Sequence, residues 1–240
     1  MGGETESIGI AEARSALTWW LEAGVDTAVQ DEPRDWLAPP SPRLKSKGAP
    51  EPAPATNIAE PTHETLAELQ QWLASSSQLP LASATARRIM PQGPENAAIM
   101  LLSEAPTLED FAAGQPIGGE SWELAKRMLA AIKIPAEQAY SASLSCFHLP
   151  GARMSAENRA ACADVARRHI RLAKPKRLLL LGDGPAQALL GKPLPQARGH
   201  VHKVEGIRTV VTFHPRQLIN QPSNKSLAWK DLLLLMENET

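Results

Sequence analysis

Two residues suited to acid–base and hydrogen-bond chemistry each follow an apolar run in this chain of 240 residues. Glu104 follows the run at 97–102, and His214 follows the run at 208–213. Pro215, directly after the histidine, stops a β-ladder and fixes the direction in which the imidazole leaves the strand. A carboxylate can hold a water molecule, and an imidazole can donate a hydrogen bond or transfer a proton. These two side chains are the candidate catalytic residues if the fold brings them together.

The sequence around these residues alternates between strand and helix patterns. Short apolar runs predict strands at 97–102, 140–144, 177–181 and 208–213. Apolar residues at helical spacing predict helices at 65–73, 121–132, 155–173, 185–190 and 226–236. Strands separated by helical crossovers indicate an α/β fold of three layers, α/β/α, around a central and mainly parallel four-stranded sheet. In such a sheet ligands bind at the rim formed by the carboxyl ends of the strands, here 103–106, 145–150, 182–185 and 214–216.

The composition changes upstream of this pattern. Residues 33–61 are rich in proline and poor in apolar side chains, which predicts a flexible linker. Residues 1–32 form a short helical N-terminal segment by prediction, because apolar residues recur at helical spacing within 10–23. This segment docks on its own domain or contacts an unknown protein. Residues 62–240 are then the α/β domain.

The composition also excludes two classes of protein. Two cysteines are too few for a disulfide scaffold, and they fit a reducing compartment. No apolar run reaches the roughly 20 residues needed to span a bilayer. The first residues lack the basic start of a signal peptide. We therefore expect a cytoplasmic protein that is monomeric and makes no membrane contact.

The net charge of −1 conceals two parts of opposite sign. Residues 151–240 carry 15 Lys and Arg against 7 Asp and Glu, whereas residues 1–150 carry 10 against 19. A basic part attracts phosphate chains, which makes a nucleic acid a candidate partner. The alternative is a solvated basic face on the helix expected around residues 159–171.

Three segments of the chain resemble the motifs of a known family. They are Glu104-Ala105-Pro106 with Gly114, Pro116 and Gly118; Cys146 with Pro150, Arg153 and Cys162; and Thr212-Phe213-His214-Pro215 with Trp229 and Lys230. Across residues 70–237 the chain is similar to the uracil-DNA glycosylase superfamily. The similarity is greatest to its iron–sulfur-bearing microbial branch, often called family four.

The resemblance implies a DNA repair hydrolase of base excision. Such a monofunctional glycosylase hydrolyses the N-glycosidic bond of uracil, or of a related deaminated base, in DNA that is single-stranded or has the base flipped out of the duplex. Glu104 would position the attacking water, and His214 would donate a hydrogen bond to the leaving base. The implied substrate-binding positions are Ala105, Pro106, Ile117, Ala142 and Ser143. The implied DNA-binding positions are Thr107, Pro215, Arg216 and Lys225.

The chain departs from the family at the iron–sulfur cluster. The family holds a 4Fe–4S cluster with four cysteines, but this chain keeps only Cys146 and Cys162. Ser76 and Leu79 stand where the resemblance places the first pair. Leucine cannot ligate iron, and two thiolates cannot hold a cluster that needs four. We therefore expect no cluster and no other metal or cofactor, with the two cysteines as inert core thiols.

The base pocket departs from the family as well. Ile117 stands where the family has an aromatic ring that stacks on the flipped base. Ala142 stands, within one residue, where an asparagine reads the edge of the base. A site without that hydrogen bonding selects its substrate far less well, so discrimination of uracil from cytosine should collapse unless Ser141 or Ser143 takes the place of the asparagine.

Other replacements keep three functions open. Ser103 and Thr107 stand where the family has glycines, which allow close approach of the backbone. His148 stands at a usually basic position, where it contacts a phosphate or is a surface histidine, and Asp183 lies in a tight strand-to-helix turn. The chain is then an active glycosylase, a catalytically degenerate relative that binds DNA or a partner without base excision, or a small-molecule hydrolase at the same rim.

Overall fold

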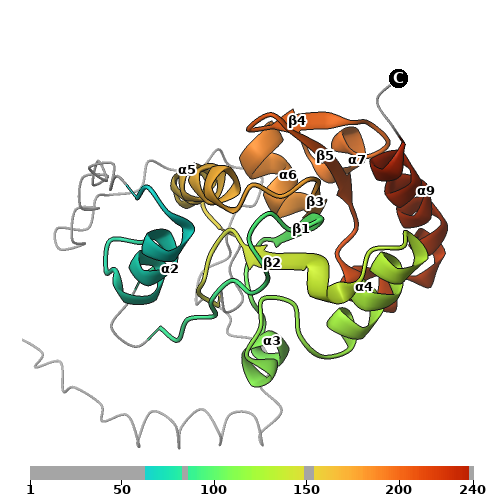
Figure 1. The fold of residues 1–240 in the computed structure, drawn as a ribbon. Helices are drawn as coiled ribbons and strands as arrows, with labels where there is room; N and C mark the ends of the chain where they lie inside the picture. The colour runs from blue at the N-terminus through green and yellow to red at the C-terminus, as the bar shows by residue number, and fades with distance from the viewer. Residues whose placement is uncertain (1–62, 83–85, 149–153, 238–240) are drawn as a thin grey trace, which may run out of the picture. The chain divides into compact units, whose positions relative to one another are not determined.

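The computed structural model describes residues 63–82, 86–148 and 154–237, which form an α/β domain around one sheet (Figure 1). The strands are β1 (Ile99–Ser103), β2 (Ala139–Ser143), β3 (Leu178–Leu181), β4 (His202–Val204) and β5 (Ile207–Thr212). Their order across the sheet is β2-β1-β3-β5-β4. The first four of these strands in the sheet run parallel, and β4 pairs antiparallel with β5. The predicted, mainly parallel sheet is confirmed, with a fifth strand at one edge.

Helices cover both faces of the sheet, which confirms the three-layer arrangement. The helices are α2 (Leu66–Ser75), α3 (Leu108–Ala113), α4 (Gly119–Ala131), α5 (Ala156–Ala173), α6 (Asp183–Leu190), α7 (Leu194–Ala197), α8 (Pro215–Asn220) and α9 (Lys225–Met236), with 3-10 turns at Ala136–Gln138 and Pro222–Asn224. One core, which contains Met100 and Leu102 of β1, joins the sheet to α5, α6 and α7. A second core, which contains Ile99 and Leu101 of β1, joins the opposite face to α4 and α9. Successive residues of a strand point to opposite faces, so β1 serves both cores and is buried along its whole length.

The helix α2 begins and packs as its sequence indicates. Thr65 Oγ1 accepts a hydrogen bond from the Glu68 backbone N–H at 3.2 Å, and the Glu68 carboxylate accepts one from the Thr65 N–H at 3.4 Å, which is a capping box. One side of the helix is buried and carries Leu66, Leu69 and Leu73. Leu69 and Leu73 share a small core with residues that follow β2, so α2 is joined to the sheet by apolar packing.

Several short elements are absent from the sequence prediction, namely β4, α3, α8 and the four-residue α7. β4 has only three residues and turns into β5 through Glu205 and Gly206, both at positive φ (50° and 79°). α3 and α8 have six residues each, too few for a helical period to show. Pro215 opens α8, because its fixed φ suits the first position of a helix, and His214 becomes the N-cap.

The predicted N-terminal helical segment and the proline-rich linker, residues 1–61, lie outside the described residues. Within 63–82, 86–148 and 154–237, no helix has both the length and the apolar character that crossing a membrane requires.

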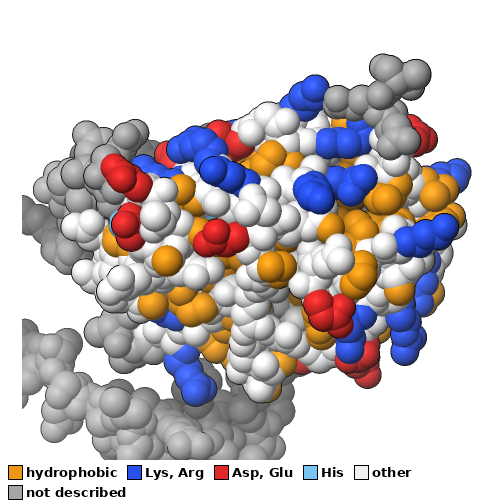
Figure 2. Space-filling view, in the orientation of Figure 1, with side chains coloured by type: hydrophobic (Ala, Val, Ile, Leu, Met, Phe, Trp, Pro, Cys, Tyr) orange, Lys and Arg blue, Asp and Glu red, His pale blue; other side chains and the backbone are white. Residues whose placement is uncertain are grey.

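The basic character of the C-terminal part is visible on the surface. Figure 2 shows Lys and Arg side chains gathered mainly over the upper and right-hand parts of the face in view. On α5 part of this charge is paired, because Arg167 and Arg171 contact Glu205 at 3.5 and 2.9 Å. The basic helix face is therefore only partly available to an anionic ligand.

Candidate active site

A pocket of about 330 Å³ opens at the rim formed by the carboxyl ends of the parallel strands. Its lining consists of Glu104, Ala105, Pro106 and Thr107 after β1, His148 after β2, Leu181, Gly182 and Asp183 at the end of β3, and His214, Arg216 and Gln217 after β5. The four strand ends therefore meet as the sequence predicts. Because β3 lies between β1 and β5, two strand spacings, about 10 Å, separate the backbone at Glu104 from that at His214. The volume is within the range of about 300–1,000 Å³ that is usual for small-ligand pockets.

Glu104 reaches this pocket past a glycine of α6. A Cβ added at Gly184 would lie 2.3 Å from Cδ of Glu104, far inside van der Waals contact. The carboxylate thus packs directly on the backbone of the first turn of α6. Only glycine leaves room for the carboxylate in this position. Gly184 was not predicted as a site residue, although its place in a tight turn directly after a buried strand was a usable signal.

His214 is held in one tautomer by the helix that it caps. Its Nδ1 accepts a hydrogen bond from the backbone N–H of Arg216 at 3.1 Å, so the neutral ring carries its proton on Nε2. The pKa of His214 is lowered from 6.5 to about 4, chiefly by burial and also by the Arg216 charge, while the Asp110 carboxylate opposes both. Near pH 7 the imidazole is therefore neutral and can donate a hydrogen bond from Nε2.

A buried carboxylate braces the two motifs that carry these residues. Asp110 is 1% exposed, and its Oδ2 accepts hydrogen bonds from the backbone N–H and the hydroxyl of Thr107, both at 2.7 Å, and from Arg216 Nη2 at 3.1 Å. Its Oδ1 accepts from the Gly118 N–H at 2.6 Å. The segment after β1 is thus tied to the segment after β5. Asp110 was not predicted as a site residue, although the capping pattern of Thr107 and Asp110 could have indicated it.

Two further pocket residues are engaged by neighbouring backbone groups. His148 is half-buried, and its Nδ1 lies 2.8 Å from the carbonyl oxygen of Pro106. Asp183 accepts a hydrogen bond from the Leu194 N–H at 2.7 Å and another from the Gln187 side chain. Asp183 therefore holds the start of α7 and does more than shape the predicted tight turn.

Five of the expected contact residues lie outside the lining of this pocket, and they are Ile117, Ala142, Ser143, Pro215 and Lys225. The sequence-based placement is corrected for the first three, which were expected to contact the base. Ile117 is 1% exposed in the core on the side of α4 and α9, and Ala142 is 0% exposed in the core on the side of α5. Ala142 faces α5 because successive residues of a strand point to opposite faces of the sheet.

The other three serve elsewhere. Ser143 shares a hydrogen bond of 2.8 Å with the hydroxyl of Ser103, its partner in the parallel register. Pro215 is buried as the first residue of α8. Lys225 is exposed and lines a separate groove between α4 and α9. Arg216, also expected to contact DNA, does line the pocket but is paired with Asp110.

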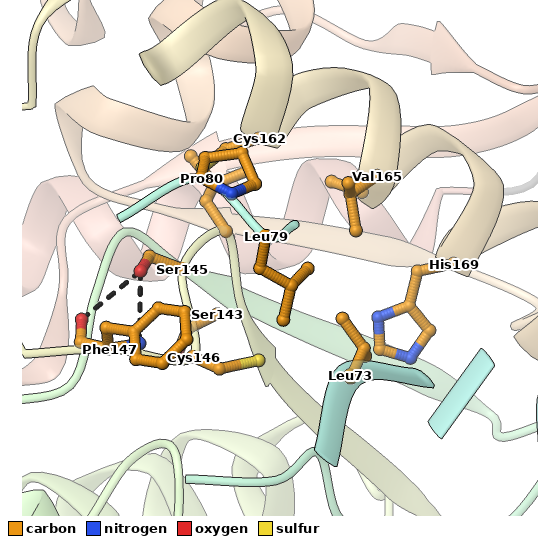
Figure 3. Close-up of a pocket in the computed structure, with 12 residues that line it drawn as sticks. Leu73, Leu79, Pro80, Ser143, Ser145, Cys146, Phe147, Cys162, Val165 and His169 are labelled. Carbon is orange, nitrogen blue, oxygen red and sulfur yellow. Dashed lines mark hydrogen bonds between the residues drawn. The ribbon is translucent and has the colours of Figure 1, made fainter. Parts of the chain in front are cut away.

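The two cysteines lie around a second, nearly filled pocket between α2, β2 and α5. In Figure 3, Leu79 and Pro80 project between Cys162 of α5 and the segment that holds Cys146. The space left is about 10 Å³, enough for about one water molecule. Burial raises the pKa of the Cys146 thiol to about 11 and that of Cys162 to about 12. Among the described residues no group of three or more metal-ligating side chains occurs. These residues do not fit a 4Fe–4S cluster.

The fold and the rim pocket define a class of α/β enzyme-like domain with a carboxylate and a neutral imidazole on one ligand site. A family model described as "Uracil DNA glycosylase superfamily" matches residues 90–234, more than half of the chain, and the chain belongs to this superfamily. The chain is 22% identical over 180 residues to a type-4 uracil-DNA glycosylase of Pyrobaculum aerophilum, which covers 70% of this chain and 92% of the relative. It is 23% identical over 170 residues to a type-4 uracil-DNA glycosylase of Archaeoglobus fulgidus, which covers 66% of this chain and 85% of the relative. The resemblance to family four is confirmed.

Proposed function

We propose that this chain is a DNA glycosylase that hydrolyses the N-glycosidic bond of uracil, or of a related deaminated base, in DNA. The observation that carries the proposal is that Glu104 and His214 line one pocket at the strand ends. Membership in the superfamily and the names of the type-4 relatives support the same activity.

Glu104 acts on the water side of the reaction. Hydrolysis of a glycosidic bond passes through a state in which the sugar resembles an oxocarbenium ion. The Glu104 carboxylate orients a water toward C1′ of the deoxyribose and faces the positive charge that develops on the sugar ring. Its contact with Gly184 fixes the direction of the carboxylate before the substrate arrives.

His214 acts on the leaving base. As the bond breaks, negative charge develops on a carbonyl oxygen of uracil, and the Nε2–H of His214 donates a hydrogen bond to that oxygen. The backbone N–H of Arg216 keeps Nδ1 unprotonated, so the donor is already oriented. One preorganised donor of this kind contributes about 3–4 kcal/mol to lowering the barrier.

The substrate must be extruded from its stack before it can enter the pocket. A base in a duplex offers no access to its glycosidic bond, so the enzyme takes a flipped or single-stranded nucleotide. The exposed Lys225 and the excess of basic residues in 151–240 attract the phosphate backbone. DNA affinity should accordingly fall steeply as the salt concentration rises.

We propose in addition that the domain carries no iron–sulfur cluster. Leu79 and Pro80 project into the space between the two thiols (Figure 3), and apolar packing joins α2 to α5. Purified protein should contain no iron and show no iron–sulfur absorbance. Stoichiometric iron with acid-labile sulfide would contradict this part of the proposal.

A second candidate function is DNA binding without base excision. It is favoured by the residues at two positions, because Ile117 and Ala142 stand where the family has a stacking ring and an asparagine, and both are buried in the cores. Such a protein would bind a uracil oligonucleotide with a steep salt dependence and would leave the glycosidic bond intact.

The test is an alkali-cleavage assay on a single-stranded oligonucleotide with one uracil. The protein should create an alkali-labile site, and Glu104→Gln and His214→Ala should remove this activity. Glu137→Gln is the matched control for the carboxylate, because Glu137 is exposed just before the amino end of β2, whereas the pocket lies at the carboxyl ends of the strands. His200→Ala, at an exposed histidine outside the pocket, is the control for the imidazole. Salt-sensitive binding without cleavage would favour the second candidate function.

A further inference from the structure

The pocket holds a second imidazole that the proposed reaction leaves without a role. His148 follows β2, is half-buried, and lines the pocket together with Glu104 and His214. Its ring and that of Phe111 form a T-shaped pair, with the ring centroids 6.2 Å apart and the planes at 77°. The ring is thus held on one side by an aromatic contact and on another by the carbonyl of Pro106.

The contacts of the two histidines indicate opposite tautomers. His148 Nδ1 lies 2.8 Å from the Pro106 carbonyl oxygen, and a carbonyl oxygen only accepts, so Nδ1 of His148 carries the proton. His214 Nδ1 accepts from the Arg216 N–H at 3.1 Å, so His214 carries its proton on Nε2. In their neutral forms, Nε2 of His148 is an acceptor and Nε2 of His214 is a donor.

This assignment separates the two contacts that His148 can make. A phosphate requires a donor, and the single N–H of the neutral ring is already bonded to Pro106. A ligand that offers an N–H group instead matches the free Nε2. Gln217 also lines the pocket and has an amide oxygen, which lies at the end of a longer and more flexible side chain. Ordering this longer side chain costs more conformational entropy than using the fixed ring of His148.

We propose that Nε2 of His148 accepts the hydrogen bond of the N3–H group of uracil, while Nε2–H of His214 donates to the adjacent carbonyl oxygen. The edge of uracil presents an N–H donor beside a carbonyl acceptor, and the two imidazoles are complementary to that pair. Cytosine has a lone pair at N3, which would face the lone pair of His148. This inference rests on the proposed function, and it makes His148 the residue that selects uracil while Ala142 is buried in the core.

Two substitutions of His148 separate its two nitrogens. In His148→Asn the carboxamide reaches the place of Nδ1, so the bond to Pro106 is kept and the Nε2 acceptor is lost. In His148→Gln the longer side chain places a carboxamide oxygen near the position of Nε2. Each variant is compared with the wild type on single-stranded oligonucleotides that contain deoxyuridine or N3-methyldeoxyuridine, because the methyl group removes the donor.

The wild type should excise uracil at least tenfold faster than N3-methyluracil. In His148→Asn this preference should fall by roughly three- to tenfold, the effect of one hydrogen bond, and the loss should lie in the rate on uracil. His148→Gln should keep most of the preference. The proposal is overturned if His148→Asn keeps the wild-type preference for uracil over N3-methyluracil. The same conclusion follows if Gln217→Leu loses this preference while His148→Asn retains it.

A binding measurement distinguishes failure of this inference from failure of the proposed function. Protein labelled with ¹⁵N at histidine is titrated with 1-methyluracil and with 1,3-dimethyluracil, and the imidazole nitrogen resonances are followed. A change at Nε2 of His148 with 1-methyluracil only supports the acceptor role, even in a protein that excises nothing. No change with either compound, or the same change with both, overturns it, whether or not the protein excises uracil.

Discussion

Gly184→Ala tests how closely the carboxylate of Glu104 must be positioned. The new methyl group would lie 2.3 Å from Cδ of Glu104, whereas ordinary contact between carbon atoms begins near 3.4 Å. The carboxyl group must therefore move by about 1 Å. Gly184 is not among the glycines at positive φ, so alanine is compatible with its backbone.

The expected effect is a loss of activity without a loss of stability. A displacement of about 1 Å in a catalytic group can cost about 10²-fold in rate. Alanine in a helix is more favourable than glycine by roughly 0.5–1 kcal/mol, and the group that must move is the end of a flexible side chain. The free energy of unfolding should therefore be unchanged or slightly higher.

The assay is single-turnover release of uracil, combined with urea unfolding of the same preparations. A double-mutant cycle with Glu104→Ala gives the control, because alanine lacks the Cγ and Cδ atoms that the new methyl group would meet. Gly184→Ala should cost much less in the Glu104→Ala background, where the residual rate is compared, than in the wild type. Wild-type activity in Gly184→Ala would refute the argument that this contact positions the carboxylate.

Three further predictions concern the buried carboxylate of Asp110, the buried imidazole of His169 and the packing of Leu79 between the two cysteines. Asp110→Ala should lower the free energy of unfolding by roughly 2–3 kcal/mol, measured by urea titration, because it leaves Arg216 and two backbone N–H groups unpaired while Arg216 keeps some access to solvent. Burial lowers the pKa of His169 from 6.5 to about 4, so the unfolded chain binds more protons between these values and stability should fall as the pH drops through that window. The loss is about 1 kcal/mol at pH 5.5, and His169→Gln should make the pH dependence shallower. Leu79→Ala should cost about 2–4 kcal/mol of stability without any change in iron content; equal stability would contradict the packing role.

The strand ends could be predicted from the sequence because strand burial and strand termination leave local signals. The run 178–181 consists of four leucines, typical of a parallel strand covered on both faces, and Pro215 marks the end of β5. From these signals alone, Glu104 and His214 could be placed on one rim. The helices α3 and α8 were not predicted because six residues make fewer than two helical turns, too few to show a helical period. The strand β4 was not predicted because its three residues are too few to show alternation.

The parts of the site that depend on tertiary contact could not be predicted. Ala142 was expected at the pocket, but whether it faces the pocket or the layer of α5 depends on strand register, and a shift of one residue reverses the face. The role of Asp110 as a brace requires Arg216, which is 106 positions away in the chain. The tautomer of His148 depends on one carbonyl group, that of Pro106. None of these contacts leaves a pattern in the local sequence.

The most direct measurement is a crystal structure of the Glu104→Gln protein with an oligonucleotide that contains one uracil. The flipped uracil should lie inside the rim pocket, with Nε2 of His214 at about 2.7–3.2 Å, the usual hydrogen-bond range, from a carbonyl oxygen of the base. C1′ of that nucleotide should lie on the side of residue 104. A uracil bound elsewhere on the protein, or DNA held with no base in the pocket, would contradict the central claim.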